Sequence, residues 1–337
     1  MPAASAGNQL FSKLVAFKEA TPGTIPTLTS GGRRMLVAPT GVITTGTIID
    51  LGPERSVAIR NPLISTTATI TSIEPTLSAS VPAISIGELP VWLSMTRTVS
   101  PSGTAAPYGW DYSYSMGTAA NNPTSYTMVA TDGQQQFALP YCLVESMTIA
   151  ADRSGLTNLS ANMFAQTIQK STAVLAETLP TSSFMAGRLW NAYQSGTVFP
   201  GTASGTAMTY LLDFSLEFNA GITKQAYLAG TTSFSSHSES NPFTGTLTAT
   251  VSSTADGIST WYDAYQAARP VGVRLSWSNG SGNIVHILAM VVPTAVQPMA
   301  GVEDGLTTIG LEATLVYDPT STKSLQIIVN SDLSALP

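Results

Sequence analysis

The sequence predicts a mainly β protein, and two features of the chain support this. Stretches that alternate apolar and polar residues recur along its 337 residues, and β-branched residues are frequent in them. Residues typical of turns separate these stretches, such as Asn279-Gly280 between two expected strands. Charge is scarce, since Asp, Glu, Lys and Arg make up only 10% of the chain. We therefore expect a large β protein with few surface charges.

The strand pattern is clearest in residues 211–218. Apolar residues from Leu212 to Phe218 fall on one face, while Asp213, Ser215 and Glu217 fall on the other. The expected strands cover residues 66–73, 142–150, 211–218, 244–252, 271–277, 284–292, 307–317 and 325–329.

Two segments show helical spacing instead. Residues 255–268 repeat apolar side chains every three or four positions, with Thr254 or Asp256 as an N-cap and Pro270 beyond the end. Residues 182–195 do the same between Pro180 and Gly196. We expect one helix near 255–268 and another near 182–195.

A short likeness between these two segments suggests a duplicated chain. Residues 190–194 read Trp-Asn-Ala-Tyr-Gln, and residues 262–266 read Tyr-Asp-Ala-Tyr-Gln. Each segment lies downstream of a strand-rich stretch, which is how two related halves would look. The expected organisation is an arm with the first strands at 1–58, β-rich halves at 59–200 and 205–330, and a tail at 331–337.

Two regions are candidates for contacts between subunits. Residues 99–126 are rich in Gly, Pro, Ser and aromatics and read as a long loop, and residues 1–35 read as an extended arm. Tyrosine-rich loops are common at interfaces because each ring gives contact area at low entropic cost. The candidate residues are Phe11, Phe17, Tyr108, Trp110, Tyr112 and Tyr114. The alternative for the loop is a partly ordered surface segment.

The low charge indicates a chain that covers its surface with copies of itself, because interface cores are depleted in Lys, Glu and Asp. A secreted β protein with a Ser/Thr-rich surface is the alternative. The net charge of −6 and the lack of any Lys/Arg run argue against tight binding of nucleic acid. Such a protein can still let DNA pass, since like charges repel.

No pattern of residues predicts catalysis, a cofactor or a metal site. His237 and His286 lie far apart in sequence, and no Gly-x-Ser-x-Gly motif is present to place a nucleophile. Cys142 stands in an apolar stretch, which favours a buried thiol. The longest apolar run, residues 284–296, is too short to span a membrane, and no signal peptide is evident. We expect a non-enzymatic protein made in a cytoplasm, with no membrane partner.

Four segments of the chain form a layout found in a known family. They are residues 18–24 (Lys-Glu-Ala-Thr-Pro-Gly-Thr), the strand at 141–149, the strand at 211–219, and the ending from Asp304-Gly305 through Tyr317-Asp318-Pro319 to Asn330. In these segments the chain resembles the tail tube proteins, or major tail proteins, of long non-contractile bacteriophage tails. The likeness is one of layout and covers most of residues 10–330. The chain is long for that family.

The resemblance implies a β-sandwich or barrel with one or two flanking helices. It implies rings stacked into a hollow tube through which double-stranded DNA leaves the virion of a siphovirus. The implied partners are other copies of the chain, a tape measure protein, and tail terminator and distal tail proteins. Rings would hold six chains, or three if the halves are duplicated. Two rivals are a capsid decoration protein or other virion β-protein, and a carbohydrate-binding adhesin module that stacks sugars on Trp110, Tyr112 or Trp277. A third is a hydrolase.

Overall fold

The computed structural model describes residues 13–38, 42–50, 69–114, 121–132, 135–173, 175, 177, 183–226, 233–239, 241–303 and 305–337. Over these residues the chain is mainly β, and every described strand pair is antiparallel. The strands are β1 (Lys13–Lys18), β2 (Arg33–Met35), β3 (Val42–Thr44), β4 (Thr47–Asp50), β5 (Thr69–Ile73), β6 (Thr76–Val81), β7 (Tyr108–Tyr114), β8 (Tyr126–Thr131), β9 (Gln136–Asp152), β10 (Asn158–Phe164), β11 (Gln169–Lys170), β12 (Trp190–Gln194), β13 (Thr206–Met208), β14 (Leu211–Asn219), β15 (Thr223–Gln225), β16 (Ser236–Ser238), β17 (Thr244–Ser252), β18 (Val271–Ser278), β19 (Ile284–Glu303), β20 (Leu306–Leu315) and β21 (Leu325–Ser331).

One layer of the fold is a sheet of eight strands in the order β3-β6-β10-β9-β14-β17-β20-β19. The second layer has two parts. One part runs β2-β1-β8-β9-β11, and the other runs β13-β12-β18-β19-β21-β7. The long strands β9 and β19 belong to both layers, because each pairs with different strands along its two halves.

A hydrophobic core fills the space between the layers. Phe218 of β14 lies 5.5 Å from Tyr114 of β7, and Phe214 of β14 meets Trp190 of β12 edge-on at 5.0 Å between ring centroids. One cluster of buried residues runs from Leu14 in β1 to Val329 in β21. The two β-rich halves expected from the sequence therefore share one large core, and two smaller buried clusters lie beside it.

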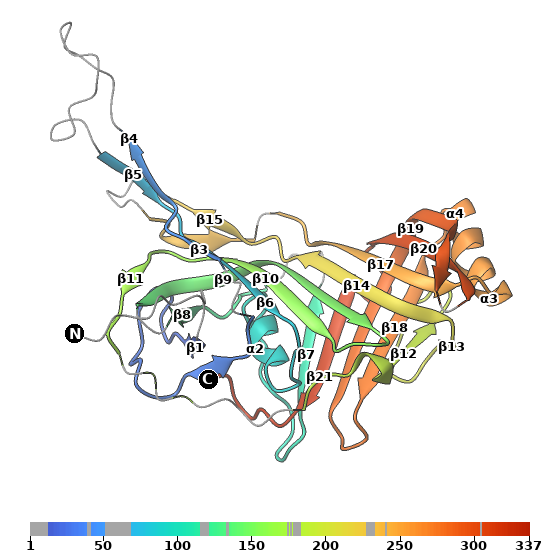
Figure 1. Ribbon diagram of the computed structural model, residues 1–337, viewed down its shortest axis with the longest axis horizontal. Helices are drawn as coiled ribbons and strands as arrows, with labels where there is room; N and C mark the ends of the chain where they lie inside the picture. The colour runs from blue at the N-terminus through green and yellow to red at the C-terminus, as the bar shows by residue number, and fades with distance from the viewer. Residues whose placement is uncertain are drawn as a thin grey trace, which may run out of the picture.

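The helices are short. Helix α2 (Leu89–Ser94) is wholly buried, and a second helical segment is made of α3 (Ala255–Gly257), η2 (Ile258–Tyr262) and α4 (Asp263–Gln266). The Thr254 hydroxyl caps this segment by accepting from the Gly257 N–H at 3.1 Å. The helix expected near 255–268 is therefore present, and Figure 1 shows it at one end of the molecule.

The prediction of a helix near 182–195 is wrong, and so is the prediction of a single long loop over 99–126. Residues 187–189 form one 3-10 turn, and β12 then pairs along β18, so backbone pairing has overridden the helical spacing. Inside the expected loop, β7 pairs along its whole length with β21. Residues 13–35 of the expected arm contribute β1 and β2 to a sheet. The first twelve residues lie outside the described residues.

A candidate assembly surface

The same order of strand pairings occurs twice along the chain. In the eight-strand sheet, β3-β6-β10-β9 is followed by β14-β17-β20-β19. In the other layer, β2-β1-β8-β9-β11 corresponds to β13-β12-β18-β19-β21. The chain therefore consists of two repeated units, of which the first ends with β11 and the second begins with β12. The sequence pattern instead placed the division near residue 200.

Registers agree at the level of single residues. In β6, Leu77, Ala79 and Val81 lie opposite β10, and in β17, Leu247, Ala249 and Val251 hold the same places opposite β20. The two strands read Thr-Leu-Ser-Ala-Ser-Val (76–81) and Thr-Leu-Thr-Ala-Thr-Val (246–251). A β-bulge interrupts β9 at Glu145, and another interrupts β19 at Thr294, in matching positions. The likeness of 190–194 to 262–266 is unrelated, because the first is a strand and the second is helical.

The two units join edge to edge within the chain. Strand β9 of the first unit pairs with β14 of the second over seven residue pairs, from Asp213 opposite Asp152 to Asn219 opposite Ser146. At the two outer ends of the eight-strand sheet, the corresponding edges have no partner strand among the described residues. These edges are β3 and residues 292–303 of β19.

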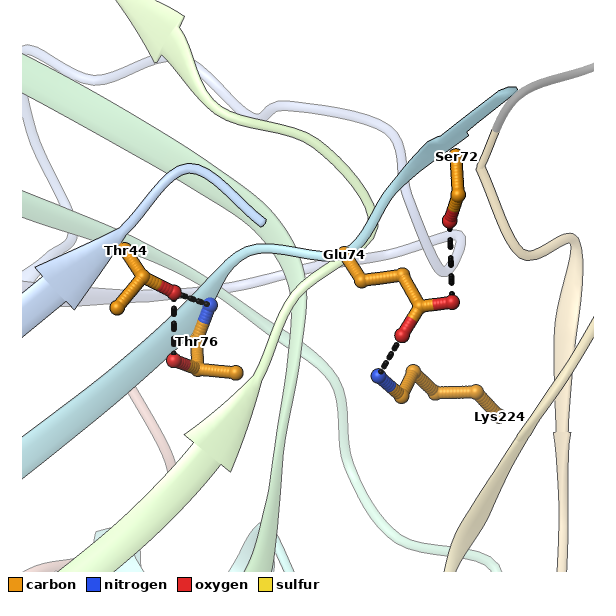
Figure 2. A network of polar contacts seen from close by, with 5 residues as sticks. All are labelled: Thr44, Ser72, Glu74, Thr76 and Lys224. Carbon is orange, nitrogen blue, oxygen red and sulfur yellow. Dashed lines mark hydrogen bonds and ion pairs between the residues drawn. The ribbon is translucent and has the colours of Figure 1, made fainter. Parts of the chain in front are cut away.

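The β3 edge is held in place by polar contacts (Figure 2). The hydroxyls of Thr44 and Thr76 are 2.8 Å apart, and the Thr76 N–H donates to the Thr44 hydroxyl at 3.3 Å. Glu74 accepts from Ser72 at 3.0 Å and pairs with Lys224 of β15 at 2.7 Å. The first unit is thereby tied to the second at the base of the β4–β5 hairpin.

The β4–β5 hairpin projects away from the eight-strand sheet (Figure 1). Ile48 and Ile70 are exposed on it. Gly46 at its base has a positive φ, and a side chain there would overlap the carbonyl of Glu74. Among the described residues, the second unit has the short β15–β16 pair at the corresponding place. Within that part of the chain, the projecting hairpin therefore belongs to the first unit.

The outer face of the eight-strand sheet is polar and acidic. Its side chains alternate with the core residues of each strand, and most are Ser, Thr or Asn. Asp152, Glu217 and Glu312 lie exposed on this face, and Asp213 is partly exposed. The eight strand segments contain no Lys or Arg. A polyanion would therefore meet repulsion and no cationic partner along these strands.

The residues predicted to contact other subunits fall in different places. Phe17, Trp110, Tyr112 and Tyr114 are buried in the core of their own chain, and Tyr108 is partly exposed at the start of β7. Phe11 lies outside the described residues. The Tyr112 hydroxyl donates to the Pro90 carbonyl at 2.8 Å, so β7 is bonded to α2. Their role between subunits stays a prediction that no contact in the structure supports.

The candidate reactive groups are separated and shielded. Tyr141 Oη lies 3.0 Å from His237 Nδ1, and Ser276 Oγ lies 2.8 Å from His286 Nδ1. Burial lowers the pKa of His286, and nearby Arg274 lowers it further. Burial also raises the pKa of the Cys142 thiol, which disfavours the thiolate. Among the described residues, no cluster of His, Cys, Asp or Glu is suited to a metal ion.

Comparisons of the chain with protein-family models and with curated proteins found no match. No described helix has the length and apolar character needed to cross a bilayer. The sequence signals that indicate the repeat, and with it the candidate assembly surface, are the two matching strands, 76–81 and 246–251, and not residues 99–126.

Proposed function

We propose that this protein is the subunit of a bacteriophage tail tube, which assembles into stacked rings around a channel for double-stranded DNA. The observation that carries the proposal is the repeated sheet with a free edge at each end. The chain already contains one joint between units, β9 with β14, and its two free edges are the two sides of the same joint. Head-to-tail contact between copies would continue the sheet, and a constant rotation closes such a series into a ring.

The internal repeat favours three chains per ring. Each chain would supply two equivalent units, so three chains give six units around one axis. A free edge that pairs with a neighbour also needs no lysines to block unwanted pairing, which fits the low charge of the chain. The polar face without Lys or Arg would line the channel and let DNA slide.

The registers of the internal joint give a testable contact between copies. Glu217 lies opposite Thr148 across β14 and β9. Thr44 occupies the place of Glu217, since both lie opposite the first Thr of the matching strands. Gln297 occupies the place of Thr148, three residues beyond the bulge in each case. We expect Thr44 of one copy to face Gln297 of the next.

Electron microscopy of the purified protein at rising concentration tests the function itself. Hollow tubes or stacked rings of uniform width are the expected result. The double variant Thr44→Cys/Gln297→Cys then tests the ring. After oxidation, denaturing gel electrophoresis of this variant should show disulfide-linked species of up to three chains and none larger. Thr44→Cys alone is the control. A ladder that stops at six would refute the three-chain ring, and protein that stays monomeric at every concentration would refute the tube.

A capsid decoration protein shares the composition and remains the second candidate; assembly into flat or capsid-bound oligomers would favour it. The adhesin alternative loses support, because Trp110, Tyr112 and Trp277 are fully buried and offer no ring to a sugar.

A further inference from the structure

The free edge of β19 differs in length from the matching edge of β9. Between Gln297 and Gly301, β19 has three residues where its partner strand β20 has one. At the matching place in the first unit, β9 and β10 pair residue by residue from Met147 to Ala150. This stretch of β19, the edge bulge (residues 298–300), therefore gives the free edge two more residues than the edge that forms the internal joint.

The edge bulge lies against the outer face of the eight-strand sheet. A side chain placed on Gly310 of β20 would come within 3.3 Å of the Ala300 Cβ. The matching position of β10 holds Ser160, where the strand beside it has no bulge. Met299, at the centre of the bulge, is 86% exposed. The glycine thus leaves room for a bulge that projects from the free edge.

Two prolines lie along the same edge. Residues 292–303 of β19 include Pro293 and Pro298 and contain no Lys or Arg, whereas residues 143–152 of β9 contain no proline. Proline cannot donate a backbone hydrogen bond, and it is confined to edge strands and bulges for this reason. Bulges and prolines both interrupt the row of backbone groups with which another chain could pair. The β19 edge therefore has two features that oppose pairing, and the β9 edge has neither.

We propose that the edge bulge hinders pairing between copies at the β19 edge and so sets the concentration at which assembly begins. The inference rests on the proposed head-to-tail ring, in which β3 of one copy pairs with β19 of the next. In the register of the internal joint, Leu216 lies opposite Ile149, and Ile43 takes the place of Leu216. Ile43 is the middle residue of β3, so the neighbour's strand would meet the bulge at its centre.

The bulge makes a joint between copies harder to form than the joint within the chain. Strands β9 and β14 pair over seven successive residues without interruption. A neighbour's β3 has to displace the bulge before the same pairing can continue along β19. Folding, which forms the internal joint, is thereby separated from assembly, which forms the joint between copies.

Deletion of Pro298 and Ala300 tests this role. The deletion leaves Gln-Met-Gly where β9 has Thr-Ile-Ala at 148–150, so the free edge regains the length of the β9 edge. The variant should form tubes at a concentration about tenfold lower than the wild type, because backbone hydrogen bonds that the bulge interrupts become available to the neighbour. Light scattering measures this concentration, and electron microscopy identifies the tubes.

Met299→Ser is the matched control for the deletion. It keeps the length of the edge bulge and removes the exposed apolar side chain, so the concentration at which assembly begins should not change. If Met299→Ser shifted that concentration as much as the deletion does, the side chain and not the bulge would control assembly, and the proposal would fail.

A glycine inserted after Met299 should change assembly in the opposite direction. It lengthens the bulge at an exposed position, so this chain should fold even where the deletion variant does not, as circular dichroism would verify. A higher concentration for assembly is the expected result. Folded insertion and deletion variants that assemble at the wild-type concentration would overturn the role of the bulge and leave the tube intact. If the wild type and both variants stay monomeric at every concentration, the tube fails as well.

Discussion

The conversion of Glu19 to glutamine should destabilise the folded chain by several kcal/mol. The Glu19 carboxylate is 5% exposed and accepts three hydrogen bonds. Its Oε1 accepts from the Thr127 hydroxyl and the Tyr141 N–H, and its Oε2 accepts from the Gly23 N–H, all at 2.8 Å. The residue therefore fixes the loop after β1 to β8 and β9.

The size of the effect follows from these partners. A glutamine oxygen can still accept from Thr127 and Tyr141, but its amide nitrogen would face the Gly23 N–H, donor against donor. A buried donor without a partner costs ~1–3 kcal/mol, and the two remaining bonds lose the assistance of the charge. We expect a loss of about 2–4 kcal/mol in the free energy of unfolding for Glu19→Gln.

Urea unfolding followed by tryptophan fluorescence, at a concentration below assembly, measures this loss. Glu145→Gln is the control, because Glu145 is exposed at the bulge in the neighbouring strand. If Glu19→Gln changed the free energy of unfolding by no more than about 0.5 kcal/mol, as an ordinary surface substitution does, the role of Glu19 in fixing the loop after β1 would be refuted.

Three further predictions concern the outer face of the eight-strand sheet, the buried Glu88 and Tyr114 of β7. Glu217→Lys/Glu312→Lys should leave the chain folded and assembled but make its tubes retain double-stranded DNA at low salt in a filter-binding assay; tubes that retain none would count against the channel face. Burial raises the pKa of Glu88 to about 7, above its usual 4.5. Its stabilising contribution is thus complete below pH 4.5 and lost as pH rises through 7. Unfolding free energy should fall over this range by up to ~3 kcal/mol in the wild type, and less in Glu88→Gln when the two are unfolded in urea at several pH values. Tyr114→Phe removes the 2.6 Å contact to the Thr96 hydroxyl, so denaturation should show a loss of ~1 kcal/mol with assembly unchanged; impaired assembly of the folded variant would restore Tyr114 to the interface.

The sequence predicted the fold class and many of the strands because local alternation is strong where one face is buried. Strands β14 and β17 show that alternation clearly, and both lie near their expected positions. Strand β7 alternates aromatic residues with Gly109, Asp111 and Ser113, but it was missed because the residues around it are dense in Gly, Pro and Ser and its partner β21 lies some two hundred residues away. Periodicity near Met185 and Trp190 favoured a helix, but long-range pairing with β18 decided the outcome.

The candidate assembly surface could be predicted only in part. The low charge pointed to self-association, but aromatic content pointed to β7, whose rings fill the core of the chain. Free edges such as β3 cannot be recognised without the order of the strands, since their residues resemble those of paired strands. The repeat was visible in 76–81 and 246–251, but four identical residues out of six gain weight only when their registers agree.

In the part of the chain that the structure describes, the β4–β5 hairpin occurs once although the sheet order occurs twice. In a ring of three chains, the channel would present six near-equal walls while the outside carried only three arms. Passing cargo would then meet almost the same surface every sixth of a turn. The next ring would meet a β4–β5 hairpin at every third of a turn. A duplicated chain can therefore give the channel a near-sixfold wall while placing only three hairpins on each ring, which six identical short chains cannot do.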